Sequence, residues 1–130
     1  MGVVGVTGWS MTTTEYSVAT VLGSVSATSN NEIKTGTGSA ARLRSAQDID
    51  KAPDGNFWIT TRFDKANHGV WKMTPDYTLS KITVVADDAD LTGAHPWGAS
   101  FDANGKYIFA AKAVAKVMTC SADGAVDVIA

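Results

Sequence analysis

One internal repeat constrains the fold of this chain more than any other feature of its sequence. Residues 47–60, QDIDKAPDGNFWIT, align without a gap with residues 97–110, WGASFDANGKYIFA. Each segment holds a short strand-forming run, an Asp-Gly or Asn-Gly turn, and a second run rich in aromatic and β-branched residues. Asp-Gly and Asn-Gly supply the positive φ angles that two-residue hairpin turns require. The repeat therefore predicts two β-hairpins of the same design.

Two further strands follow each hairpin, separated by a second turn. The turns are predicted at 74–77 and 121–124, the third strands at 69–73 and 115–119, and the fourth strands at 79–85 and 125–129. Four short antiparallel strands, repeated about every 40–50 residues, are typical of a propeller blade. We therefore expect an all-β fold of antiparallel, four-stranded, blade-like repeats that form a partial β-propeller.

The division of the chain follows from these repeats. Residues 45–94 are predicted to form the first blade-like repeat and residues 95–130 the second, within a single structural domain. Residues 1–44 do not match the repeat, and they are predicted to form an N-terminal segment of strands and loops.

The composition agrees with a β-rich globular chain and argues against two classes of partner. Of the 130 residues, 45% are hydrophobic and 18% are charged, and the net charge is −2. Such a chain lacks the positive surface that attracts nucleic acids or anionic membranes. The first basic residue is Lys34, so the N-terminus has no basic start of a signal peptide. We expect a soluble, unprocessed protein; its compartment is not predicted, and both the cytoplasm and a virus particle are compatible with the sequence.

The repeats carry a family resemblance. The run APDGNFWITTRFDKANHGVWKMTPDYTLSKI, residues 52–82, resembles blades of NHL-type and streptogramin-lyase-type β-propellers. The second run, HPWGASFDANGKYIFAAKAVAKVMTCSADGAVDVI, residues 95–129, keeps their His-Pro-x-Gly opening and both turns. The resemblance covers residues 45–130 and implies the propeller fold. It implies no single function, because such propellers serve as enzymes, lectins and scaffolds.

A chain of two blades leaves apolar faces that something must cover, because repeat proteins need about three or more units to be stable. The residues expected on these faces are Trp58, Ile59, Phe101, Tyr107 and Phe109. Either identical chains close a ring by cyclic symmetry, or residues 1–44 cap a compact monomer. We expect self-association as a homo-oligomer, with a trimer as the first guess, or association with other subunits of an assembly.

No group of residues is typical of an active site, so no catalytic residue, cofactor or metal is predicted. Cys120 is the only cysteine, and its apolar run indicates a buried strand thiol. His68 and His95 are the only histidines, which are too few for the metal site of a lyase-like propeller. The acidic residues of 87–90 depart from the spacing of a calcium loop and are predicted to be solvated. A degenerate lyase-like enzyme is therefore only a third hypothesis.

The candidate ligand-binding residues are Trp97, His95 and Trp9. Aromatic faces at propeller loops can stack on sugar rings, and Trp97 follows a His-Pro pair in a predicted loop. Trp58 and Trp71 lie in the middle of predicted strands and are expected to be structural. We therefore predict a non-catalytic binding module, with carbohydrate as its candidate ligand. The alternative is a structural or assembly protein of a larger particle, such as a decoration or tail-associated protein of a virion.

Overall fold

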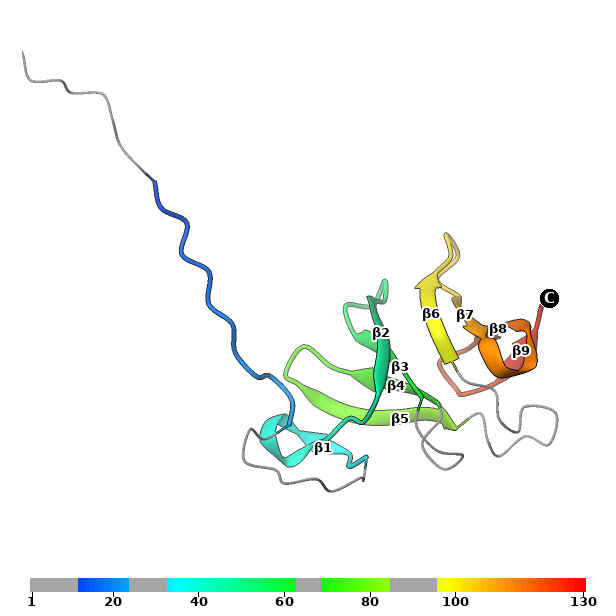
Figure 1. Ribbon diagram of the computed structural model, residues 1–130, viewed down its shortest axis with the longest axis horizontal. Helices are drawn as coiled ribbons and strands as arrows, with labels where there is room; N and C mark the ends of the chain where they lie inside the picture. The colour runs from blue at the N-terminus through cyan, green and yellow to red at the C-terminus, as the bar shows by residue number, and fades with distance from the viewer. Residues whose placement is uncertain (1–11, 24–32, 63–68, 85–95) are drawn as a thin grey trace, which may run out of the picture.

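The computed structural model of the chain describes residues 12–23, 33–62, 69–84 and 96–130 (Figure 1). Within these ranges the fold is all-β, with two antiparallel sheets of five and four strands. The helical elements in the same ranges are two short 3-10 helices, Gly38–Ala40 and Lys112–Val114. The predicted all-β, antiparallel fold is therefore confirmed.

The first sheet combines the first repeat with one strand from the N-terminal segment. Its strands are β1 (Gly36–Thr37), β2 (Ala46–Lys51), β3 (Phe57–Thr61), β4 (Gly69–Met73) and β5 (Thr78–Val84). Strands β2 to β5 pair in chain order as a meander. β1 adds to the outer edge of β5, where Gly36 lies opposite Leu79 and Thr37 opposite Thr78.

The second repeat forms the second sheet by itself. Its strands are β6 (Pro96–Phe101), β7 (Tyr107–Ala111), β8 (Lys116–Cys120) and β9 (Val126–Val128). They also pair in chain order, and β6 lies against β2 and β3 of the first sheet. The two meanders are therefore neighbours that meet along their first strands (Figure 1).

The two hairpin units fold in the same way. The N–H of Gly55 donates to the carbonyl of Ala52 at 2.9 Å, and the N–H of Gly105 donates to the carbonyl of Asp102 at 3.0 Å. β2 then pairs with β3 as β6 pairs with β7. The gapless sequence repeat therefore corresponds to a repeat in structure.

The turns of these hairpins are longer than predicted. Only the glycines adopt a positive φ, 86° at Gly55 and 77° at Gly105, whereas Asp54 and Asn104 do not. Asp54 instead accepts a hydrogen bond from the N–H of Asn56 at 3.0 Å. A turn followed by one left-handed glycine closes a hairpin loop of more than two residues. The prediction of two-residue turns is therefore wrong. A two-residue turn was expected to have Asp54 in the left-handed conformation as well as Gly55, but Asp54 instead accepts a hydrogen bond through its side chain.

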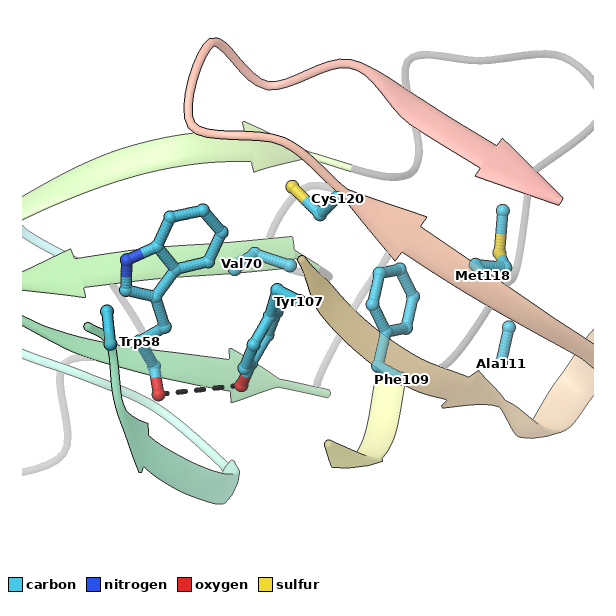
Figure 2. Close-up of a cluster of buried hydrophobic side chains, with 8 residues drawn as sticks. Trp58, Val70, Tyr107, Phe109, Ala111, Met118 and Cys120 are labelled. Carbon is cyan, nitrogen blue, oxygen red and sulfur yellow. Dashed lines mark hydrogen bonds between the residues drawn. The ribbon is translucent and has the colours of Figure 1, made fainter. Parts of the chain in front are cut away.

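The two sheets enclose a hydrophobic core (Figure 2). Its buried members are Ala52, Trp58, Val70, Tyr107, Phe109, Ala111, Met118 and Cys120. The rings of Trp58 and Tyr107 lie 5.1 Å apart, and the ring of Phe101 lies 5.2 Å from that of Trp58. Tilted and edge-on ring pairs at these distances add stability beyond the area that they bury. The aromatic positions of the two repeats thus meet each other.

The opposite face of the first sheet is covered by the N-terminal segment. A second buried cluster consists of Ala41, Ile59, Trp71, Met73 and Leu79, with Leu22, Ile33, Leu43 and Phe57 packed against it. The covering segment is held by an isolated bridge in which Lys34 and Arg42 exchange backbone hydrogen bonds of 3.1 and 2.8 Å. Residues 33–43 therefore cap the first sheet, as expected if the N-terminal residues cover a blade end.

Candidate functional site

Trp97 lies at the corner where the two sheets meet. It is the second residue of β6, and its side chain is 40% exposed. Its carbonyl oxygen accepts a hydrogen bond of 3.0 Å from the hydroxyl of Thr60, which is fully buried in β3. The backbone of Trp97 is thus fixed to the first sheet while its indole ring remains accessible.

Two cations lie over the ring of Trp97. The guanidinium carbon of Arg62 is 5.0 Å from the ring centroid, and the Nζ of Lys112 is 4.6 Å from it. Arg62 follows β3, and its N–H donates to the carbonyl of Ser45 at 3.0 Å. Lys112 begins the 3-10 helix after β7. Three segments that are distant in sequence therefore form one aromatic and cationic corner.

This arrangement changes what Trp97 can bind. Cations within about 6 Å of an indole centroid are attracted to its π face, so they compete with a stacking ligand for that face. A neutral sugar would have to displace them, whereas an acidic group would be attracted to them. The sequence indicated the exposed tryptophan but not its two cations, because they come from elements 35 and 15 positions away along the chain.

The other predicted ligand-binding residues, His95 and Trp9, lie outside the described residues, as do His68 and the acidic residues of 87–90. Within the described ranges, no three His, Cys, Asp or Glu side chains are grouped as metal ligands would be. The same ranges contain no helix that is long and apolar enough to cross a membrane.

Cys120 is a buried thiol in β8, as its apolar run predicted. Burial raises the pKa of this thiol to about 12, with a smaller contribution from the negative charge of Asp123. At neutral pH the side chain is therefore the protonated thiol, which is a poor nucleophile. Its surroundings are the core between the sheets, where it packs beside Tyr107 and Trp58 (Figure 2).

The second sheet has one face that stays exposed. A shallow hollow there is lined by Gly98, Ser100, Ile108, Ala110 and Val117, which together we call the bare face, and also by Asp48 and Asp102. Val117 is 36% exposed, Ala110 is exposed, and Ile108 is half-buried. Unlike the two faces of the first sheet, this face is not part of either buried cluster.

The residues that were expected to form exposed apolar faces are buried or partly buried in the structure. Tyr107 and Phe109 are buried between the sheets, and Ile59 is buried under the N-terminal cap. Successive side chains of a strand point to opposite faces, so Ile108 and Ala110 lie on the other side of β7. The expectation that these aromatic residues form exposed apolar faces is therefore wrong, because they pack against the other sheet of the same chain.

The sequence matches no known protein-family model, and it has no significant match among curated proteins.

Proposed function

We propose that this chain is a non-catalytic binding and assembly module made of NHL-like, propeller-type blades, and that its bare face docks on the bare face of a second copy. The observation that carries this proposal is the unequal covering of the two sheets. The first sheet is buried on one side by the second sheet and on the other side by residues 33–43. Among the residues that the structure describes, only the first of these two covers is found on the second sheet.

The composition of the bare face suits contact between two sheets. The five residues of the bare face are small or aliphatic and uncharged, whereas Asp48 and Asp102 also line the hollow. Sheets that pack face to face lie about 10 Å apart, which side chains of this size can fill. An isologous contact requires only one self-complementary surface, so two copies could bury their bare faces together.

A trimeric ring places different demands on the chain. Each copy would have to pack its bare face against the outer face of the next copy's first sheet. Residues 33–43 already cover that outer face, with Ala41 fully buried against it. Ring closure therefore needs this cap to move aside, whereas the face-to-face dimer does not. The two assemblies differ in mass.

Light scattering over a range of concentrations tests the proposal. Below about 100 μM, a specific dimer is expected to be populated by the wild-type chain. Val117→Asp, which places a charge on the bare face, is expected to shift the mass toward that of the monomer. Ile49→Asp is the matched control, because Ile49 is a 52% exposed aliphatic residue on a strand of the first sheet. A wild type that is strictly monomeric would contradict the proposal. A trimeric mass would also contradict the face-to-face dimer and would support the trimeric ring instead.

A second candidate function is suggested by the corner of Trp97. The two cations over its ring favour a saccharide that carries a carboxylate or sulfate over a neutral one. Binding to a glycan array is expected to be restricted to acidic glycans, to be lost in Trp97→Ala, and to be weakened in Lys112→Gln. Lys116→Gln, a change of the same charge on β8, serves as the control. Binding of neutral glycans, or the absence of any glycan binding, would contradict this second candidate function.

A further inference from the structure

The N-terminal part of the described chain forms an exposed arm. Residues 12–21 belong to no helix or strand, run outward as an extended trace in Figure 1, and are all exposed. Tyr16 is 89% exposed and Val18 is fully exposed. The arm joins the body of the protein at Gly23, whose N–H donates to the carbonyl of Gly38 at 3.1 Å. Figure 1 shows the arm leaving the molecule beside β1 and pointing away from the second sheet.

The sequence of the arm is that of a strand. The run from Tyr16 to Val21, YSVATV, combines an aromatic residue with β-branched residues, which are enriched in strands. An extended backbone has N–H and C=O groups that readily pair with the edge of another sheet. A strand-forming segment that pairs with no strand in the described part of its own chain therefore indicates a partner strand elsewhere.

The second sheet has an edge that such a strand would fit. The N–H of Ile129 donates to a carbonyl of β8 at 2.9 Å, and Asp127 lies opposite Thr119 in the same ladder. Hydrogen-bonded pairs alternate along antiparallel strands, so Asp127 is also bonded to β8. Val126 and Val128 then direct their N–H and C=O groups outward. Among the described residues, no backbone hydrogen bond is made to these outward groups.

The first sheet shows how the chain fills the equivalent edge. The turns before β5 and β9 are matched, because Tyr77 donates to Thr74 at 2.8 Å as Gly124 donates to Ser121 at 3.0 Å. Counted from these turns, β9 corresponds to β5. β5 carries β1, a strand from the N-terminal segment, on its outer edge. β9 has no fifth strand in the described part of the chain.

We infer that residues 12–21 of a second copy add to the outer edge of β9 as a fifth strand, so that two copies exchange their arms. The inference rests on the proposed assembly function and names the segment that completes the second sheet. A second copy is favoured over the chain's own arm because the arm begins beside β1 and points away from β9 (Figure 1). Reciprocal exchange satisfies both edges through one two-fold axis, and strand addition supplies affinity through backbone hydrogen bonds.

Proline variants of the full chain test this exchange. Val18→Pro removes an N–H from the arm, and Val126→Pro removes an outward N–H from β9 without removing a hydrogen bond to β8. Each variant is expected to weaken dimerisation by at least about tenfold, as measured by light scattering and analytical ultracentrifugation. Val18→Thr and Val126→Thr keep the N–H groups and are expected to dimerise like the wild type.

Mixing the two proline variants provides the decisive measurement. A Val18→Pro chain has an intact edge and a Val126→Pro chain has an intact arm, so their mixture contains one functional pairing that neither variant has alone. The mixture is expected to form a heterodimer. If Val126→Pro does not fold, as judged by circular dichroism, the comparison of Val18→Pro with Val18→Thr decides.

The outcomes separate this inference from the proposed function. If Val117→Asp dissociates the dimer while Val18→Pro leaves it intact, docking through the bare face is supported and arm exchange is overturned. If Val18→Pro dissociates it while Val117→Asp does not, arm exchange holds without docking of the bare face. A wild type that stays monomeric at all concentrations overturns both.

Discussion

The carboxylate of Asp50 accepts a hydrogen bond of 3.1 Å from the backbone N–H of Phe101, and this contact joins β2 of the first sheet to β6 of the second. Asp48 accepts in the same way from the N–H of Ala99 at 2.9 Å. Each carboxylate also accepts the N–H of the residue that follows it, at 2.9 Å for Asp48 and 2.8 Å for Asp50. Two aspartates therefore bridge strand edges that do not pair directly.

This bridge predicts a dependence of stability on pH. The N–H of Phe101 lowers the pKa of Asp50 below its usual value, and Lys51 N–H and the hydroxyl of Ser100 lower it further. A carboxyl group with a lowered pKa in the folded state stabilises the fold above its unfolded pKa, about 3.9. That stability is lost as the pH falls through the folded pKa. Asp50→Asn is therefore expected to make the free energy of unfolding less dependent on pH below about 4.

Urea denaturation of the wild type and Asp50→Asn at several pH values measures this effect. At pH 7 the substitution is expected to cost about 1 kcal/mol, since Asp50 is only half-buried and water partly screens its hydrogen bonds. Asp127→Asn, at an exposed position of β9, is the control. Identical acid profiles for Asp50→Asn and the wild type would show that the bridge does not contribute to stability.

Adjacent residues of β7 are predicted to differ sharply in their importance for stability. Phe109 is 1% exposed between the sheets, whereas Ile108 lies on the bare face. Phe109→Ala is expected to lower the free energy of unfolding by about 3–5 kcal/mol, because it removes a buried ring and leaves a cavity. Ile108→Ala is expected to cost less than about 1 kcal/mol when measured on the monomer. Equal losses would mean that β7 is not buried on one face only.

The two turn glycines provide a matched pair of substitutions. Gly55 has a φ of 86° and open space where a Cβ would lie, whereas a Cβ at Gly105 would lie 3.4 Å from Cγ of Pro53. Alanine at either position is strained by the left-handed backbone, at a cost of about 1 kcal/mol. Gly105→Ala is expected to be the more destabilising in thermal denaturation, because it also crowds the turn of the first repeat. The reverse order would contradict the close approach of the two turns.

The thiol of Cys120 is predicted to report on unfolding. Burial and a pKa of about 12 make the native thiol slow to react with alkylating reagents near pH 8. Its modification is therefore expected to follow the unfolded fraction as urea is added, and to coincide with the loss of the circular dichroism signal. Ala111→Gly, which weakens the same core cluster, should shift both transitions to lower urea together. Rapid modification in the absence of urea would show that the second sheet opens without global unfolding.

Much of the architecture was predictable from local sequence. The strands before and after Gly55 and Gly105 occur where the repeat predicted them, because β-branched and aromatic runs favour extended backbone and glycine permits the left-handed turn position. The candidate site was only partly predictable. Trp97 was recognisable as an exposed aromatic residue, but Arg62 and Lys112 were not recognisable as its neighbours.

By itself, the sequence determined that this chain forms two antiparallel meanders of the same design, since strand and turn preferences depend on neighbouring residues. Only the tertiary structure decided which alternate side chains are buried, that residues 33–43 cover the first sheet, and that Asp50 reaches Phe101. Burial depends on contacts between segments that are far apart in the chain. A period of two identifies two faces for a strand but does not say which of them will meet another sheet.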